Sequence, residues 1–417
     1  MSSAILAKVF MNQKKIRIFE MFSGIGSFYQ AFKDIFEPKG YEVISVGYCE
    51  WAWPAIVAYE VLHHNFLPTW TEPLITKALP ISWNGTDFLT KLSLLDNTIK
   101  ATYLNHSLQF SKNLFDVKKI KNLNNMHLDV LTYSFPATSI SKQGRQQGLA
   151  RQSQTPSSLM WEIERILYYT HLNHRPKYLI MENSTSLQGS KFKVHFNEFV
   201  WRLNQLGYES KIYYMNSLDY QSPQNRNRLF MISIRSDLKD RIDYKWLETL
   251  LPFKKFARMP LKSILEDLPA NPKWANLKLE TIGWNANNKT FQYYWKEPKF
   301  EAARHIYDVN YSGPTLTATG ANNRFKIYIR PNYIREMNAL ECWRYMGWND
   351  DQFNKIKDTN YLSEKQLKFL AGNSVHLKCL HQVVGLLDFS WKDPTLIEID
   401  WEKANLKRIT YNGKTIN

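Results

Sequence analysis

The stretch "IRIFEMFSGIGSF", residues 16–28, decides how the fold begins. Its first five residues are β-rich, and Gly24 and Gly26 follow before an apolar segment with helical character. Glycine lets the backbone turn sharply and approach a ligand, and the first N–H groups of a helix are free to bind one. We therefore predict a strand, a glycine turn and a helix, with a ligand at the turn. An ordinary connection between strand and helix is the alternative.

Further β-rich segments recur along the first two-thirds of the chain. They are "EVISVGY" (42–48), "LDVLTYS" (128–134), "KYLIME" (177–182), "KIYYMN" (211–216) and "LFMISI" (229–234). Amphipathic, helix-like segments lie between several of them, at 157–170 and 193–207. This alternation is typical of the α/β class with a doubly wound, mostly parallel sheet. Ligands bind beyond the carboxyl ends of the strands in such sheets, so we expect the site there.

The length of 417 residues suggests about two domains. Residues 236–310 are rich in Lys, Trp, Asn and Pro, whereas 363–389 are again apolar and helix-like. We expect a first domain over 1–238, a second, smaller domain over 239–360, and a segment over 361–417 that returns to the first domain. Residues at about 65–112 look like an insertion, which either touches a partner or covers the sheet.

Charge and cysteine usage narrow the class of protein. Lys and Arg number 54 against 38 Asp and Glu, a net charge of +16, which favours a polyanionic partner over a merely solvated basic surface. Cys49, Cys342 and Cys379 are far apart and form no CxxC pair, so we expect no disulfide, no metal site and a cytoplasmic location. No apolar run reaches the ~18 residues of a membrane span.

Polar residues at the strand ends suggest two kinds of chemistry. Glu50, in "CEW" (49–51), can bind ribose hydroxyls and Trp51 can stack on an adenine, unless Trp51 is simply a core residue. Glu182, in "MENSTSL" (181–187), can donate a proton from a partly dehydrated carboxyl group, or can be a surface acid. Arg226 and Arg228, two residues apart, suit an anion or a carbonyl group, or form a solvated basic edge.

The order of these motifs resembles the DNA (cytosine-5)-methyltransferase family. The matching stretches, in order, are "FSGIG" (22–26), "EW" (50–51), "SFPATS" (134–139), "EN" (182–183), "QNRNR" (224–228), "PTLTATG" (314–320) and "GNS" (372–374). The sequences "YSFP", "LMWEIER", "KYLIMEN" and "PTLTATGANNR" look most like those of mollicute-type CpG methyltransferases. The resemblance covers about residues 16–385. It implies a Rossmann-like catalytic domain, a small target-recognition domain, S-adenosylmethionine as cofactor and a cytosine flipped out of double-stranded DNA.

The resemblance also implies roles for individual residues. Glu182 would protonate or hydrogen-bond cytosine N3, Arg228 would hold O2, and Arg226 and Asn183 would order their surroundings. The implied catalytic set is Phe135, Ala137, Thr138, Ser141, Glu182, Asn183, Arg226 and Arg228. The implied cofactor set is Phe22, Gly24, Ile25, Gly26, Ser27, Glu50, Trp51, Asp116, Val117, Pro136, Leu159, Asn373, Ser374 and Val375. The implied DNA-recognition set is Thr319, Gly320, Ala321, Asn322, Asn323 and Arg324, with a target that contains CG.

Ala137 stands where the family has its cysteine nucleophile. Family chemistry begins with a thiolate that attacks C6 of cytosine, and alanine has no lone pair for this step. We therefore expect binding of DNA and cofactor without methyl transfer, in an enzyme inactivated by one substitution, since decay would have damaged neighbouring motifs too. The alternatives are a natural DNA-binding regulator and an RNA cytosine-5 methyltransferase. We expect a monomer in a bacterial cytoplasm, with a separate restriction endonuclease as a further candidate partner.

Overall fold

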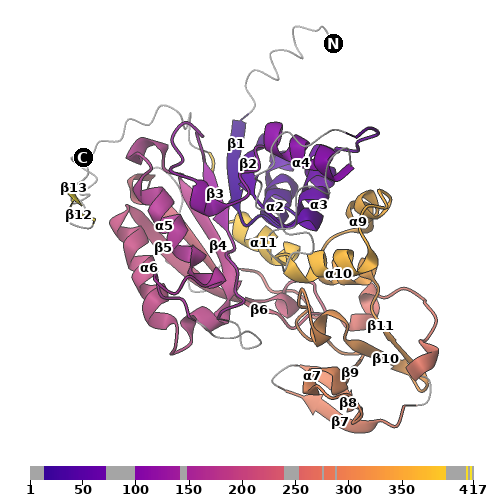
Figure 1. The fold of residues 1–417 in the computed structure, drawn as a ribbon. Helices are drawn as coiled ribbons and strands as arrows, with labels where there is room; N and C mark the ends of the chain where they lie inside the picture. The colour runs from indigo at the N-terminus through magenta and orange to yellow at the C-terminus, as the bar shows by residue number, and fades with distance from the viewer. Residues whose placement is uncertain are drawn as a thin grey trace.

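The computed structural model describes residues 14–71, 99–140, 148–238, 253–274, 277–286, 289–390, 410–411 and 414–415 (Figure 1). Its larger sheet has six strands in the order β2-β1-β3-β4-β6-β5. They are β1 (Lys14–Met21), β2 (Tyr41–Cys49), β3 (Val130–Tyr133), β4 (Tyr178–Ser184), β5 (Tyr208–Asn216) and β6 (Asn227–Arg235). The sequence predictions of these strands and of a mostly parallel sheet are confirmed. β6 runs antiparallel to both of its neighbours, β4 and β5.

Helices cover both faces of this sheet, as a doubly wound fold requires. Alternate residues of a strand point to opposite faces, so Ile18 and Ile180 enter one apolar cluster while Phe19 and Met181 enter the other. The first cluster is completed by α2 (Ser27–Phe36), α3 (Trp53–His64) and α11 (Leu377–Val384). The second is completed by α5 (Met160–Tyr168) and α6 (Lys193–Gln205). The predicted helices at 157–170 and 193–207 are thereby confirmed.

The C-terminal helices return to the start of the chain. The predicted helical region 363–389 contains two helices, α10 (Glu364–Asn373) and α11, which are separated at the "SVH" stretch (374–376). α11 packs on α2 (Figure 1), where His381 Nε2 lies 2.8 Å from Asp34 Oδ2. Helix α11 is therefore held against the first helix that follows the glycine turn.

A second sheet lies beyond the edge of the large one and has the order β11-β10-β9-β8-β7 (Figure 1). Its strands are β7 (Glu280–Asn285), β8 (Thr290–Tyr294), β9 (His305–Asp308), β10 (Lys326–Arg330) and β11 (Tyr333–Glu336), with the one-turn α7 (Glu301–Arg304) before β9. Helices α8 (Ala339–Tyr345) and α9 (Asp350–Lys357) follow it. The expected domain boundary at 238/239 falls at the start of residues 239–252, which lie outside the described residues.

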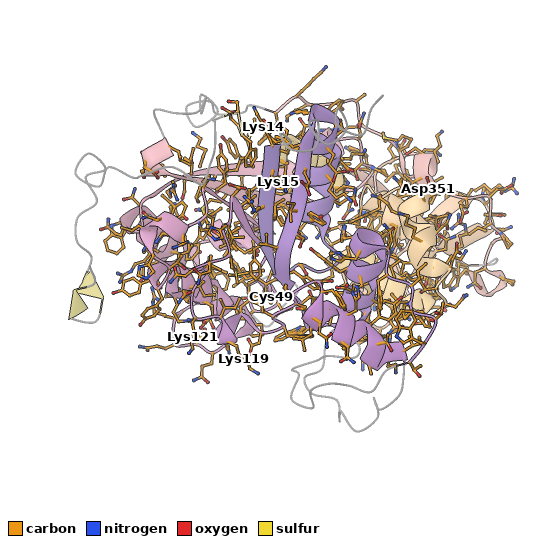
Figure 2. The ribbon with its side chains drawn as sticks, turned by 90° about the horizontal axis from the view of Figure 1, so that it is seen from above. Lys14, Lys15, Cys49, Lys119, Lys121 and Asp351 are labelled. Carbon is orange, nitrogen blue, oxygen red and sulfur yellow. The ribbon has the colours of Figure 1, made fainter. Side chains whose placement is uncertain are left out.

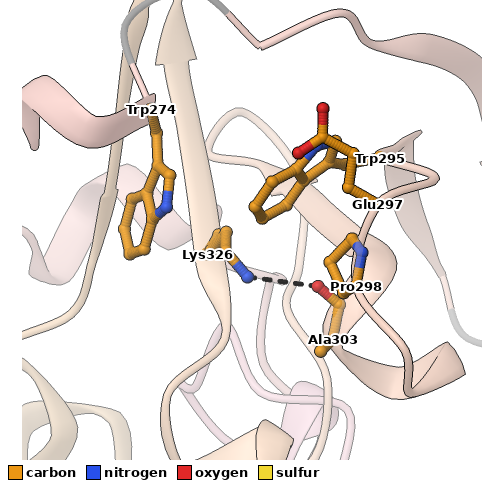
Figure 3. A pocket seen from close by; sticks show the side chains of 6 residues that line it. All are labelled: Trp274, Trp295, Glu297, Pro298, Ala303 and Lys326. Atoms are coloured by element: carbon orange, nitrogen blue, oxygen red, sulfur yellow. Dashed lines mark hydrogen bonds between the residues drawn. The ribbon is translucent and has the colours of Figure 1, made fainter.

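A buried lysine ties the strands of the second sheet to α7 (Figure 3). Lys326 Nζ lies 5.3 Å from the ring centroids of both Trp274 and Trp295, and it donates a 3.1 Å hydrogen bond to the carbonyl oxygen of Ala303. These residues line a pocket of about 390 Å³. Cation–π contacts with a desolvated ammonium group are favourable, so these contacts hold β10 against α7.

The expected insertion at about 65–112 is described only at its ends, since residues 72–98 lie outside the described residues. Its last part forms α4 (Ile99–Gln109), which packs on α3. There the rings of Tyr103 and Trp53 meet edge to face, and His106 Nδ1 lies 2.6 Å from Glu60 Oε2. In the described ranges, no helix combines the length and apolar character needed to cross a membrane.

Candidate active site

The glycine turn after β1 is pinned to the end of β2 by Glu50. The Glu50 carboxylate accepts hydrogen bonds from the backbone N–H groups of Gly24 at 2.9 Å and of Trp51 and Ala52 at 2.8 Å. Burial raises the pKa of Glu50, and these three donors oppose that shift. The structure therefore brings together two sequence-predicted cofactor residues that are 26 positions apart, Gly24 and Glu50.

At Gly24 the turn has open space that a ligand could occupy. A Cβ atom added to Gly24, whose φ is 55°, would meet nothing within 4 Å. The hydroxyl group of Ser23 is buried and has no hydrogen-bond partner among the described residues. An unpaired buried hydroxyl is costly, so an open backbone turn beside it fits a polar ligand such as a nucleoside cofactor. Phe22 and Trp51, half-buried, flank the turn, and Ser27 begins α2.

At Gly26 the turn is packed against the side chains of His63 and Tyr59. A Cβ atom added to Gly26, whose φ is 75°, would lie 2.2 Å from Nε2 of His63. Burial lowers the pKa of His63 to about 3, so the ring is neutral and Nε2 can donate to the carbonyl oxygen of Ile25 at 2.9 Å. Behind it, Glu20 accepts hydrogen bonds from Tyr29 N at 3.1 Å and the Tyr59 hydroxyl at 2.9 Å.

Residues 113–117 run alongside the end of β2. Asn113 forms a parallel bridge with Tyr48, and its side chain hydrogen-bonds the backbone N–H and C=O of Glu50 at 3.1 and 3.0 Å. Asp116 follows and caps the short helix Val117–Lys119 by accepting from Lys118 N. The long gap in sequence between Glu50 and Asp116 is therefore closed in space, and both lie at the carboxyl edge of the sheet. Figure 2 shows Cys49 at this edge and Lys14 and Lys15 at the opposite end.

The loop that carries Ala137 follows β3 directly. The Ser157 hydroxyl donates to the carbonyl oxygen of Pro136 at 2.7 Å and accepts from Ser139 N at 3.2 Å. Ala137 is half-buried, its carbonyl oxygen accepts from Ile140 N at 3.1 Å, and Thr138 is exposed. Leu159, just after Ser157, is buried in the apolar cluster below. The predicted residue Ser141 lies outside the described residues.

A carboxyl group, an amide and a guanidinium gather beside this loop. Asn183 Nδ2 donates to the carbonyl oxygen of Phe135 at 2.9 Å, and Ser134 Oγ donates to Glu182 Oε2 at 2.8 Å. Arg228 Nε lies 3.0 Å from Glu182 Oε1, as an ion pair without hydrogen-bond alignment. Glu182 is only 5% exposed, and Oε1 has no aligned hydrogen-bond donor among the described residues.

Sequence reasoning missed Ser134, although the register could have found it. β3 and β4 are parallel with Tyr133 opposite Met181, so the next residue on each strand is Ser134 and Glu182. Arg228 reaches the same carboxyl group from the other side, because Glu182 on β4 and Arg228 on the antiparallel β6 are diagonal neighbours. The reversed direction of β6 is what brings its first residues to the carboxyl edge of the parallel strands.

Arg226 is buried and joins three segments rather than sharing a ligand with Arg228. Its guanidinium donates to the carbonyl oxygens of Leu316 at 2.8 Å and Ser374 at 3.2 Å. Burial, followed by repulsion from Arg228, lowers the pKa of Arg226 to about 9. The "QNRNR", "PTLTATG" and "GNS" motifs therefore meet at one side chain. Val375 is buried beside them, and Asn373 is exposed.

The loop expected to read DNA sits on α10. A Cβ atom added to Gly372 would lie 2.1 Å from the carbonyl oxygen of Thr317, so the two backbones are in close contact. Asn323 is buried, and its side-chain amide donates to the carbonyl oxygens of Thr317 at 2.8 Å and Lys368 at 3.1 Å. The other predicted recognition residues are exposed (Thr319, Gly320, Arg324) or half-buried (Ala321, Asn322).

The strand order sets the sequence of chemical groups along this edge. Glu50 follows β2, the glycine turn follows β1, Ala137 lies beyond β3, and Glu182 lies near the end of β4, where β4 pairs with the first part of β6. The open glycine turn and a buried carboxyl group thus flank a loop that carries the methyl side chain of Ala137. The arrangement can hold a cofactor beside a planar substrate, but Ala137 offers no nucleophile.

Comparisons with known proteins agree with this geometry. The family "C-5 cytosine-specific DNA methylase" matches residues 86–387. The chain is 33% identical over 405 residues to the orphan methyltransferase M.SssI of Spiroplasma monobiae, covering 91% of this chain and 99% of that protein. It is 28% identical over 385 residues to the type II methyltransferase M2.ScrFI of Lactococcus lactis subsp. cremoris, covering 88% and 98%.

Solved structures show the same fold. The Dnmt2 methyltransferase of S. pombe aligns with a TM-score of 0.56 at 14% identity, over 90% of this chain and 98% of that one. The Entamoeba histolytica methyltransferase EhMeth aligns with a TM-score of 0.56 at 15% identity, over the same shares. The sequence resemblance to the cytosine-5 methyltransferases, mollicute type included, is confirmed, and family membership implies S-adenosylmethionine as methyl donor. The chain belongs to the C-5 cytosine-specific DNA methylase family.

Proposed function

We propose that this chain binds S-adenosylmethionine and duplex DNA and flips a cytosine, and that Ala137 stops it before methyl transfer to C5. The observation that carries this proposal is the half-buried Ala137 in a loop that Ser157 and Asn183 hold by hydrogen bonds at Pro136 and Phe135. Alanine cannot form the bond to C6 that makes C5 reactive. The intact hydrogen bonds of Ser157 and Asn183 to the loop favour an inactivated enzyme over a decayed one.

The residues of the glycine turn would hold the cofactor. The open space at Gly24 and the unpaired Ser23 hydroxyl support a nucleoside ligand there. Glu50 would bind the ribose and Trp51 the adenine ring, with Asp116 at the exocyclic amine. Bound S-adenosylmethionine supplies the electrophilic methyl group, and the chain's own residues orient it beside the loop. Asn373, Ser374 and Val375 would close the methionine end.

Glu182 and Arg228 would receive the flipped cytosine. A buried carboxylate oxygen without an aligned donor carries a desolvation cost, and a base edge with N–H groups would remove that cost. Cytosine presents such a donor at N4 beside N3, which suits Glu182, while its O2 would accept from Arg228. Unpairing and unstacking a base costs a few kcal/mol, which contacts of this kind recover.

Residues 236–330 would recognise duplex DNA, and the net charge of +16 supports a polyanionic partner. Exposed Thr319, Gly320 and Arg324 are the candidates for direct contact with a CG-containing target. We assign Asn323 to holding this loop, because its amide already bonds Thr317 and Lys368. We also propose the domain boundaries given above and a monomer in the bacterial cytoplasm. A cognate restriction endonuclease is an open candidate partner.

Titration calorimetry with S-adenosylhomocysteine tests the cofactor part of the proposal. The chain as it stands should bind this product analogue, and Glu50→Ala should weaken binding at least tenfold. Asp237→Ala is a matched control, because Asp237 pairs with Arg235 at the far end of β6 and should leave affinity unchanged. Absence of binding by the parent chain, with and without DNA, would refute the proposal.

A further inference from the structure

We propose that Ser134 is a positioning residue that orients the Glu182 carboxyl group toward the flipped base. The inference rests on the proposed role of Glu182 and assigns a function to a residue that stands outside the motif roles given above. Ser134 Oγ donates to Glu182 Oε2 at 2.8 Å. Among the described residues, it is the one hydrogen-bond donor aligned on this carboxyl group.

The contact follows from the sheet itself. β3 and β4 are parallel and in register at Tyr133 and Met181, so Ser134 and Glu182 are neighbours where the two strands end. A serine side chain is just long enough to bridge adjacent strands about 4.8 Å apart. Because both residues extend buried strands, the hydroxyl and carboxyl groups approach each other with little freedom, and the hydrogen bond fixes which oxygen faces outward.

The ion pair with Arg228 does not fix the orientation of the Glu182 carboxyl group. Arg228 Nε is 3.0 Å from Oε1 but is not aligned as a hydrogen-bond donor, and Arg228 Nη1 donates to the carbonyl oxygen of Asn227 at 2.7 Å. Arg228 therefore supplies charge beside Oε1, while Ser134 holds Oε2. Because Ser134 holds Oε2, Oε1 can accept a hydrogen bond from the edge of the flipped base.

Ser134 also links the carboxyl group to the loop. Ser134 lies three residues before position 137. The neighbouring contact between β4 and this loop is the hydrogen bond from Asn183 to the carbonyl oxygen of Phe135. Glu182 and Asn183, which are consecutive on β4, thus bond to Ser134 and Phe135, which are consecutive at the start of the loop. Catalytic groups must be held closely, because a misplacement of about 1 Å can cost on the order of 100-fold in rate. The pair sets the distance between the acid and position 137.

The test uses the chain as it stands and needs no methyl transfer. Affinity is measured for a CG-containing duplex whose target base is either cytosine or pyrimidin-2-one, which lacks the 4-amino group. The change in the ratio of the two affinities between variants reports the contact made by Glu182, because the weaker pairing of pyrimidin-2-one with guanine affects every variant equally. Ser134→Ala should reduce this ratio by about fivefold or more, by loss of one hydrogen bond to a charged group. Ser134→Thr, which keeps the hydroxyl group, should retain the parental ratio.

Two controls separate this role from a general loss of structure. Ser210→Ala removes a hydroxyl that pairs with Ser233 between β5 and β6, and it should leave the ratio unchanged. Affinity for S-adenosylhomocysteine should be equal in all four proteins, which shows that the variants fold. A parental ratio in Ser134→Ala, or an equal loss in Ser134→Ala and Ser134→Thr, would overturn the role of Ser134.

Glu182→Ala distinguishes this inference from the function on which it rests, because it removes both carboxyl oxygens, whereas a glutamine would still accept a hydrogen bond from N4. If Glu182→Ala lowers the ratio and Ser134→Ala keeps the parental ratio, only the role of Ser134 fails. If Glu182→Ala keeps the parental ratio, the proposed role of Glu182 fails and that of Ser134 fails with it. In the double variant, the loss should not exceed that of Glu182→Ala alone, because the two residues act through one contact.

Discussion

Position 137 lies in a loop that is held on both sides, by Asn183 at Phe135 and by Ser157 at Pro136 and Ser139. A methyl group there leaves these contacts intact, since none of them involves the side chain of residue 137. We therefore propose that binding and chemistry are separable at this residue. The hydrogen bonds hold the loop, and the absence of a thiol at position 137 would remove the covalent step.

Gly26 is the residue at which the cofactor turn tolerates least change. Gly26→Ala should weaken binding of S-adenosylhomocysteine by about 100-fold, because its Cβ would lie 2.2 Å from His63 Nε2 at a φ of 75°. Gly40→Ala is the matched control, with a φ of 83° and open space around the new Cβ. Calorimetry should show parental affinity for Gly40→Ala. Equal affinities in the parent and Gly26→Ala would contradict this account of the turn.

Glu20 makes stability depend on pH. Burial raises its pKa to about 7, from an ordinary 4.5, so the folded state keeps a proton that the unfolded state has lost. Stability from this group is therefore full below about pH 4.5 and is lost as pH rises through 7. The shift corresponds to about 3 kcal/mol at most. Glu20→Gln, which mimics the neutral acid, should gain stability relative to the parent between pH 5.5 and 8.

Urea unfolding of both proteins at several pH values measures this difference. Comparing the two cancels the opposite contribution of His63, whose pKa is lowered to about 3 and whose stabilisation is lost as pH falls below 6.5. A stability difference that stays constant from pH 5.5 to 8 would show that Glu20 does not titrate in this range.

At the scale of elements, the contact between α10 and the segment before the recognition loop joins the two sheets. Gly372→Ala should destabilise the protein by roughly 1–3 kcal/mol, the usual cost of overpacking. The new Cβ would meet backbone atoms, at 2.1 Å from Thr317 O and 2.6 Å from Ala318 N, and these cannot rotate away. Affinity for DNA should fall as well, since the loop at 319–324 moves with Thr317.

Lys365→Ala is the control on the same helix, because Lys365 is exposed. It should match the parent within ~0.5 kcal/mol in urea unfolding. Gly372→Ala with parental stability and parental DNA affinity would mean that the close approach of α10 does not hold the recognition loop.

The sequence predicts the strands but not their long-range contacts. Runs such as "KYLIME" identify β4 by their apolar, β-rich character, and the motif order identifies the strand ends that carry Glu50 and Glu182. The antiparallel direction of β6, which brings Arg228 to Glu182, depends on how β6 pairs with strands far away in sequence. The carbonyl partners of Arg226 likewise become visible only when three segments pack together, whereas the contact of Ser134 follows once the register of β3 and β4 is known.

For the whole molecule, the net charge of +16 predicts binding to DNA that weakens steeply with salt. If six or more phosphates are neutralised, affinity should drop about 1,000-fold between 50 and 200 mM salt. Fluorescence anisotropy with a labelled CG-containing duplex measures this dependence. A 2-aminopurine at the target position should brighten on binding, because the base leaves its stack. Affinity that does not change with salt would contradict an electrostatic DNA interface.

We propose that this chain carries a cytosine-5 methyltransferase site that is complete apart from the side chain at position 137. The most direct test of this claim is transfer of a tritiated methyl group from S-adenosylmethionine to CG-containing duplex DNA, compared between the chain and Ala137→Cys. We predict background incorporation for the chain and clear incorporation for Ala137→Cys, at cytosine C5 by bisulfite sequencing. Transfer by the alanine form at a rate near that of the cysteine form would contradict the claim. So would an Ala137→Cys protein that binds cofactor and DNA but transfers nothing.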